Sequence, residues 1–168
     1  LKNEKYGEEA NKSFSDGKNI LNRIIDEDIL NPKAVIGIYD AYSENETVYT
    51  QKMKFNFPRQ LVDKGKNNPN FSLADFVAPK NDYLGIFALT TGHGLKNLID
   101  EFEKQNDDYN VIMAKVIADR LVEAFAERMH ERVRTEFWGY VENETMKKED
   151  LIDEKFKGIR PAPGYPSC

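Results

Sequence analysis

The amino-acid sequence predicts one α+β domain with a largely antiparallel sheet. Three observations lead to this fold class. The 168 residues suit a single domain with a sizeable core. Apolar residues recur at helical spacing in several stretches, and short β-branched stretches bounded by polar turns lie between them. Because these stretches do not alternate regularly, a parallel sheet built from strand–helix–strand units is not expected.

The first half of the chain is expected to form one helix and a small set of strands. Apolar residues at helical spacing run from 6 to 25, and Pro32 then prevents the helix from continuing. Residues 34–39 are apolar and rich in β-branched side chains, which is typical of a strand. A polar turn over 43–46 separates this strand from a predicted hairpin. The two strands of the hairpin are 47–50 and 52–55.

The second half is dominated by a long predicted helix over 108–138. This stretch contains no proline and keeps the apolar period of an amphipathic helix. Glycine is favoured just beyond the end of a helix, so Gly139 marks its end. Two more strands and two shorter helices are expected. The strands are 71–77 and 83–90, and the helices are 95–102 and 148–156.

Composition and charge argue against several classes of partner. A net charge of −5 disfavours nucleic acid or an anionic membrane as the main partner, and no apolar run is long enough to span a bilayer. A lone cysteine, Cys168, forms no disulfide within the chain, so a reducing cytoplasm is expected. Leu1 and the final Pro-Ser-Cys are abrupt ends, so we expect a piece truncated at both ends.

One polar face of the long helix gathers charged side chains beside the apolar stripe. Such a cluster could hold the ammonium group or sulfonium charge of a ligand. The same cluster is typical of a solvated helix face with ion pairs four residues apart. Runs of charged residues on a helix usually form such a solvated face. At about 100° per residue, its members are Asp119, Glu123, Glu127, His130 and Arg134.

Neither a metal site nor a catalytic residue is predicted. The two histidines, His93 and His130, are far apart in sequence and lack the spacing of metal ligands. The chain has no G-x-S-x-G elbow, no Walker loop and no G-x-G-x-x-G fingerprint.

The C-terminal segment 158–166 combines an arginine, a tyrosine and three prolines. Prolines hold the backbone extended, and Gly164 permits a sharp turn or a close approach to a ligand. The planar guanidinium of Arg160 suits a carboxylate, and Tyr165 offers a flat face and a hydroxyl. The segment could therefore bind a small molecule that carries a carboxylate and an aromatic base. A stiff tail or a linker to another domain explains the same composition.

Several stretches in order resemble the activation domain of cobalamin-dependent methionine synthase. The family's signature loop, Arg-x-x-x-Gly-Tyr, is intact from Arg160 to Tyr165. The resemblance covers almost all of the chain, which we therefore assign as a partial activation domain over 1–168. The other stretches that carry it are 30–32, 73–80, 107–110, 118–127, 130–134 and 137–140.

The resemblance implies a helmet-like α+β fold with a central antiparallel sheet and a role in reactivating a methyltransferase of methionine biosynthesis. Such a domain binds S-adenosylmethionine and supports the reductive remethylation of cob(II)alamin. Cobalamin itself is held by a neighbouring cobalamin-binding domain, and flavodoxin or an equivalent reductase supplies the electron. The chain is then a module of an enzyme and is not catalytic alone. The alternative is a standalone, non-catalytic module that docks onto a corrinoid protein.

The resemblance also assigns roles to five residues of this sequence. Arg160 would pair with the methionine carboxylate, Ala162 would contribute backbone contacts, and Tyr165 would line the loop. Glu123 would approach the polar end of the ligand from the long helix. Asp119, one turn earlier, would face the cobalamin domain. This chain departs from the family at 91–95, where the family is more acidic, and one acidic ligand-binding residue of the family falls before Leu1.

Overall fold

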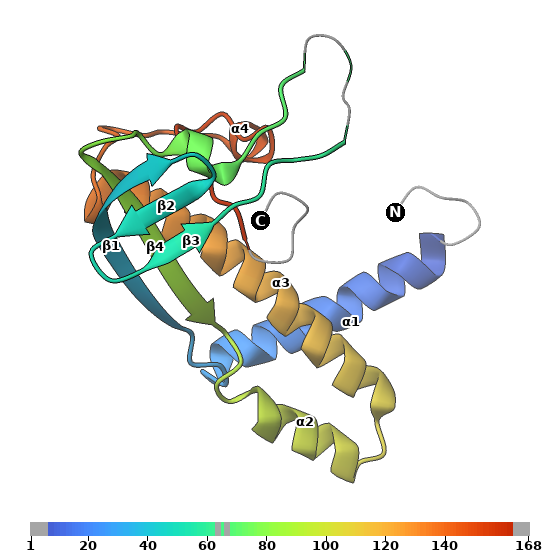
Figure 1. Ribbon diagram of the computed structural model, residues 1–168. Helices are drawn as coiled ribbons and strands as arrows, with labels where there is room; N and C mark the ends of the chain where they lie inside the picture. The colour runs from blue at the N-terminus through green and yellow to red at the C-terminus, as the bar shows by residue number, and fades with distance from the viewer. Residues whose placement is uncertain (1–6, 63–64, 66–67, 163–168) are drawn as a thin grey trace. The chain divides into compact units, whose positions relative to one another are not determined.

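The computed structural model describes residues 7–62, 65 and 68–162, and it confirms the predicted α+β class (Figure 1). The chain divides into two compact units, each built from two stretches. The first unit comprises Leu1–Val35 with Ala88–Met129, and the second comprises Ile36–Phe87 with His130–Cys168. Among the described residues, no helix is long and apolar enough to cross a membrane.

The elements follow one another as α1 (Gly7–Asp26), β1 (Lys33–Glu44), β2 (Thr47–Thr50), β3 (Lys54–Asn56), the 3-10 helix η1 (Leu73–Phe76), β4 (Asp82–Thr90), α2 (Leu95–Lys104), α3 (Asp108–Arg132), the π-helix η2 (Val133–Phe137) and α4 (Lys148–Ile152). The predicted helices and the hairpin are thereby confirmed. Strand β1 continues five residues beyond the expected end at 39, and α4 ends earlier than the expected 156.

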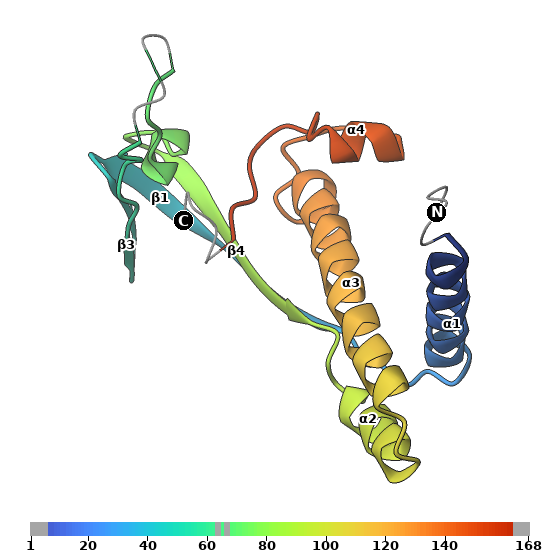
Figure 2. The same ribbon diagram turned by 90° about the vertical axis from the view of Figure 1, so that its right-hand side faces the viewer.

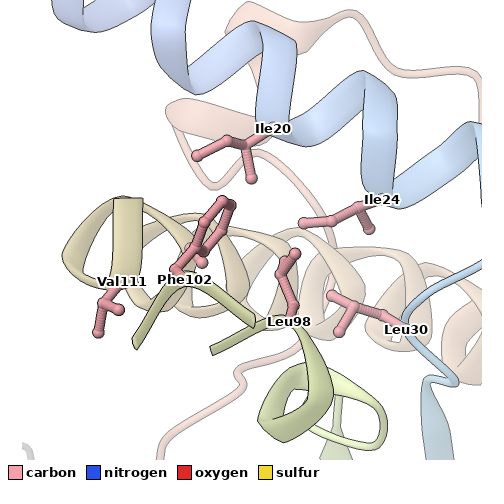
Figure 3. Packing of buried hydrophobic residues seen from close by; sticks show 7 residues of the cluster. Ile20, Ile24, Leu30, Leu98, Phe102 and Val111 are labelled. Atoms are coloured by element: carbon pink, nitrogen blue, oxygen red, sulfur yellow. The ribbon is translucent and has the colours of Figure 1, made fainter. Parts of the chain in front are cut away.

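The first unit is a packing of α1, α2 and most of α3 (Figure 2). Their apolar faces meet in one buried cluster, in which the Leu98 side chain is 2% exposed. Truncating Leu98 to alanine would leave a cavity, at a cost of about 3 kcal/mol in the free energy of unfolding. The cluster consists of Ile20, Ile24, Leu30, Leu98, Phe102, Val111 and Ala114 (Figure 3).

The second unit contains the sheet, whose strand order is β3-β2-β1-β4. Strands β1, β2 and β3 are antiparallel neighbours, with Ala41 opposite Thr50 and Val48 opposite Phe55. Ala41 and Val48 alternate with outward-facing tyrosines, as expected when one face of a strand is buried. They pack with Ala74 and two other apolar residues of the loop after β3, so this face of the sheet is covered.

The predicted strand over 71–77 is wrong, because local hydrogen bonds fold this segment into η1. The Ser72 hydroxyl accepts from the Ala74 backbone N–H at 3.1 Å, and the Ser72 N–H donates to Asp75 at 3.0 Å. This reciprocal capping box satisfies donors at the start of a helical turn. Arg59 then binds both Asp75 carboxylate oxygens, at 2.6 and 2.7 Å.

The long helix predicted over 108–138 is confirmed, with one departure near its end. After Arg132 the helix widens into the π-helix η2, in which the Trp138 N–H donates to the Val133 carbonyl oxygen at 3.0 Å. A π-turn inserts one extra residue into the helical ladder. Gly139 follows with φ of 70°, the left-handed conformation typical of a residue just past a helix.

Candidate functional site

The polar face predicted on the long helix divides into an exposed part and a buried part. Asp119 and Glu123 are exposed in the first unit, where Glu123 accepts a hydrogen bond from Arg120 at 2.8 Å. His130 and Arg134 belong to the second unit and are 4% and 0% exposed. The solvated-face interpretation therefore fails for these two residues, because both are covered by the segment that follows the helix.

Arg134 forms a buried ion pair with Glu144. The Arg134 Nε atom donates to Glu144 Oε2 at 2.8 Å, and Nη2 donates to Oε1, so the pair is bidentate. The Glu144 side chain is only 4% exposed. Hydrogen bonding to the guanidinium holds the pKa of Glu144 below its usual range. The pair ties η2 to the loop over 139–147, and the Val141 N–H adds a bond to the Arg134 carbonyl oxygen at 3.0 Å.

His130 lies one turn before Arg134, and it is buried as a neutral imidazole. Burial and the nearby Arg134 charge lower its pKa to about 4. The rings of His130 and Phe156 meet edge to face, with their centroids 4.9 Å apart. Within the described residues no group of three or more His, Cys, Asp or Glu side chains could hold a metal ion.

Phe156 lies between the two buried side chains of the helix end. The central carbon of the Arg134 guanidinium is 4.5 Å from the Phe156 ring centroid, while His130 contacts the ring edge-on. An arginine near an aromatic ring is attracted electrostatically, more strongly where water is excluded. Phe156 therefore anchors the C-terminal segment four residues before Arg160.

A second anchor lies at Lys157 and Gly158. The Tyr140 hydroxyl donates to the Lys157 carbonyl oxygen at 3.1 Å. Gly158 has φ of 97°, and a Cβ atom there would lie 2.7 Å from the same hydroxyl oxygen. Only glycine combines this backbone conformation with so close an approach. The ring of Tyr140 packs on Trp138, with the centroids 5.2 Å apart.

The sheet supports this second anchor through Trp138. The rings of Tyr83 on β4 and Trp138 meet edge to face, with centroids 6.0 Å apart. Gly85, on the same face of β4, leaves room for the indole, because a Cβ atom there would already be 3.4 Å from it. A chain of aromatic contacts thus leads from the sheet to the C-terminal segment.

The structure places the predicted ligand-binding residues as follows. Arg160 and Ala162 are half-buried in the second unit, directly after the two anchors. Tyr165, together with the rest of the loop from 163 onward, lies outside the described residues. Asp119 and Glu123 lie one turn apart on α3 and belong to the first unit.

Sequence reasoning missed the residues that hold this segment. Glu144 carried no signal, since it stands in a polar loop ten residues after its partner. Phe156 and Gly158 carried a weak signal. Phe156 is an aromatic residue in a charged stretch, and Gly158 stands two residues before Arg160. The arrangement as a whole presents a half-buried cation on a firmly held backbone, which suits a carboxylate.

Two comparisons with known proteins bear on this site. The sequence profile of the family described as vitamin B12 dependent methionine synthase, activation domain, matches residues 1–168. Among solved structures, the crystal structure of the MetH reactivation domain bound to AdoHcy is similar to this chain, with 44% sequence identity and a TM-score of 0.90. The similarity covers 100% of this chain and 55% of that one, so this chain spans about half the length of its solved relative.

Proposed function

We propose a function from one premise: this chain belongs to the family of activation domains of vitamin B12-dependent methionine synthases. It binds S-adenosylmethionine and serves as the reactivation module of a cobalamin-dependent methyltransferase. With one electron from a reductase, transfer of the methyl group of that ligand to cob(II)alamin would give methylcobalamin and release AdoHcy. The match over the whole chain favours this function over a standalone module that only docks onto a corrinoid protein.

The observation that carries the proposal is the placement of Arg160 directly after two anchors. A guanidinium on a held backbone loses little freedom when it binds both oxygens of a carboxylate. The solved relative binds AdoHcy, which has the same amino-acid carboxylate and the same adenosine as S-adenosylmethionine. In this proposal Arg160 binds that carboxylate, Ala162 adds backbone contacts and Tyr165 lines the loop.

We also propose roles for two carboxylates on α3. Glu123 meets the ammonium group and the sulfonium charge of S-adenosylmethionine, because opposite charges attract. Its present partner is the exposed Arg120, and an exposed ion pair of this kind contributes little to stability. Glu123 is thus available to a cationic ligand. Asp119, exposed one turn earlier, faces the neighbouring domain that carries cobalamin.

The remaining chemistry belongs to partners. Cobalamin, held by its own domain, would supply the cobalt to which the methyl group passes. Flavodoxin or an equivalent reductase supplies the electron. We assign no catalytic residue to this chain, whose part is to bind and orient the methyl donor. A reducing cytoplasm suits this chemistry and the single cysteine.

The proposal is tested by calorimetric titration of S-adenosylmethionine into the complete natural protein. Arg160→Ala is expected to weaken binding by about 10- to 100-fold, since a hydrogen bond to a charged group is lost. Lys148→Ala is the matched control, because it removes an exposed positive side chain of the same unit that belongs to neither anchor. Equal affinity of the wild type and Arg160→Ala would contradict the role of Arg160, and an absence of binding by the wild type would contradict the function.

A companion titration examines Glu123 with two ligands. AdoHcy lacks the sulfonium charge, so Glu123→Gln should weaken the binding of S-adenosylmethionine more than it weakens the binding of AdoHcy. Equal losses for both ligands would show that Glu123 does not meet the sulfonium.

A further inference from the structure

We infer that Arg134, Glu144 and Phe156 are positioning residues that set the location of Arg160. The inference rests on the proposed function, because it concerns how the same ligand site is built. None of the three is assigned a contact with the ligand. They act through the backbone of residues 156–160.

The ion pair between Arg134 and Glu144 is buried. Arg134 and Glu144 are almost completely excluded from water and bind each other through two hydrogen bonds. Geometry of this kind allows little movement of either side chain, since any displacement would leave a buried charge unpaired. The end of the long helix and the loop over 139–147 are therefore held in one fixed relation.

Phe156 contacts the same end of the long helix. The guanidinium of Arg134 contacts the ring, and His130 meets it edge-on at 4.9 Å. Two groups on successive turns of the same helix thus fix the position of one side chain in the C-terminal segment. Among the described residues, Arg134 Nη1 has no hydrogen-bond partner, and the central guanidinium carbon lies 4.5 Å from the centroid of the Phe156 ring.

Arg160 lies only a short distance along the chain from the two anchors. Three residues lie between Phe156 and Arg160, and the second anchor at Gly158 leaves only Ile159 between. Two residues of extended chain span about 7 Å. A shift of the anchors by 1 Å therefore moves the Arg160 backbone by a similar amount, which is enough to disturb a bidentate contact.

A purely structural role for the ion pair predicts different behaviour. Buried ion pairs are often no more stabilising than apolar side chains of similar volume. Replacing the pair by Arg134→Met with Glu144→Leu should then leave both folding and ligand affinity intact. If the pair positions Arg160, the same double variant should still fold but should bind the ligand more weakly.

The experiment measures AdoHcy affinity and the thermal midpoint of the complete natural protein. We expect the double variant and Phe156→Leu each to raise the dissociation constant about 10-fold, while Phe156→Tyr, which keeps the ring face, restores it to within about twofold of wild type. Ile152→Ala is the matched control, because this exposed apolar residue of α4 lies four residues before Phe156.

A double-mutant cycle with Arg160 gives the decisive readout. If Phe156 acts through Arg160, Phe156→Leu costs no further affinity once Arg160→Ala is present. A general loss of structure would add to the effect of Arg160→Ala. Additive losses, or wild-type affinity in Phe156→Leu, would overturn the inference even if the double variant failed to fold.

The same series separates the two proposals. Unchanged affinity in Arg160→Ala would overturn the proposed role of Arg160 whatever the other variants do. A loss in Arg160→Ala with wild-type affinity in Phe156→Leu would leave the proposed function standing and remove only the positioning role.

Discussion

Gly94 lies against the carbonyl oxygen of Ile29, so closely that no Cβ atom fits between them. The contact is made inside the first unit, where Gly94 has φ of 94° and stands at the start of α2. Next to it, the His93 carbonyl oxygen accepts from the Asn31 N–H at 2.9 Å. The Gly-His-Gly stretch therefore has a structural explanation: it joins the start of α2 to the chain that leaves α1.

Gly94→Ala is expected to destabilise the protein by about 2 kcal/mol or more, because it combines a strained φ with a steric clash. The measurement is the free energy of unfolding in denaturant. Gly92→Ala is the matched control, since a Cβ atom there meets Thr90 Oγ1 at an ordinary 3.5 Å. Similar losses in both variants would contradict the assigned role of the Ile29 contact.

Gly158→Ala is expected to weaken AdoHcy binding, because its Cβ atom would displace the Tyr140 hydroxyl and move the second anchor. Tyr140→Phe removes the anchoring hydroxyl itself, so it should also weaken binding, and the double variant should lose little more than either single variant. Titration of the single and double variants measures this. Gly139→Ala serves as control: its φ is also positive, at 70°, but its Cβ atom would meet nothing closer than 3.9 Å.

Asp75→Asn is expected to lower stability in a way that depends on pH. Hydrogen bonds from Arg59 and from the Ser72 backbone lower the pKa of Asp75 to about 2, below its ordinary value of 3.8. The unfolded chain binds the proton first as pH falls, so the stabilising contribution is complete above about 3.8 and is lost towards 2. The difference in unfolding free energy between wild type and variant should shrink over that window. The exposed Asp40 offers Asp40→Asn as the matched control for the loss of one carboxylate charge.

His130 should make stability pH-dependent in a higher window. Its pKa is about 4 in the folded protein and 6.5 when unperturbed, so the unfolded chain takes up the proton between these values. Stability then falls as pH decreases from 6.5 towards 4, with a slope of up to about 1.4 kcal/mol per pH unit. Unfolding of His130→Gln across this range should lack that slope. His93→Gln, which removes an exposed imidazole, is the matched control; an identical slope in all three proteins would contradict the burial of His130 as a neutral group.

The elements that sequence predicted correctly are those whose pattern is imposed by local burial. Helices α1, α2 and α3 each bury one apolar stripe, and this leaves a period in the sequence. The segment at 71–77 has the apolar content of a strand, yet the Ser72–Asp75 capping box turns it into η1. That outcome depends on side-chain hydrogen bonds, which hydrophobic periodicity does not register.

The candidate site was predictable only in part. Arg160 could be proposed as a ligand-binding residue from its proline-rich setting and from the family loop, and it stays a proposal. His130 and Arg134 could not be separated from the exposed Asp119 and Glu123, because a helical projection places all four on one face. Their burial follows from contacts with Glu144 and Phe156, which are 10 to 26 residues farther along the chain. Such pairings are tertiary, and a single sequence carries no local signal for them.

Neither of the two compact units is a continuous piece of chain, and this has a consequence for synthesis on the ribosome. The apolar side chains of α1, in residues 1–35, can be buried only after residues 88–129 have been synthesised. Residues 36–87 likewise need the stretch that begins at 130. Contacts between distant stretches slow folding, and the nascent chain exposes apolar strands in the meantime. Translation has to pass Met129 before the first unit can close, so a pause or a premature stop before that point leaves both halves open to chaperones and proteases.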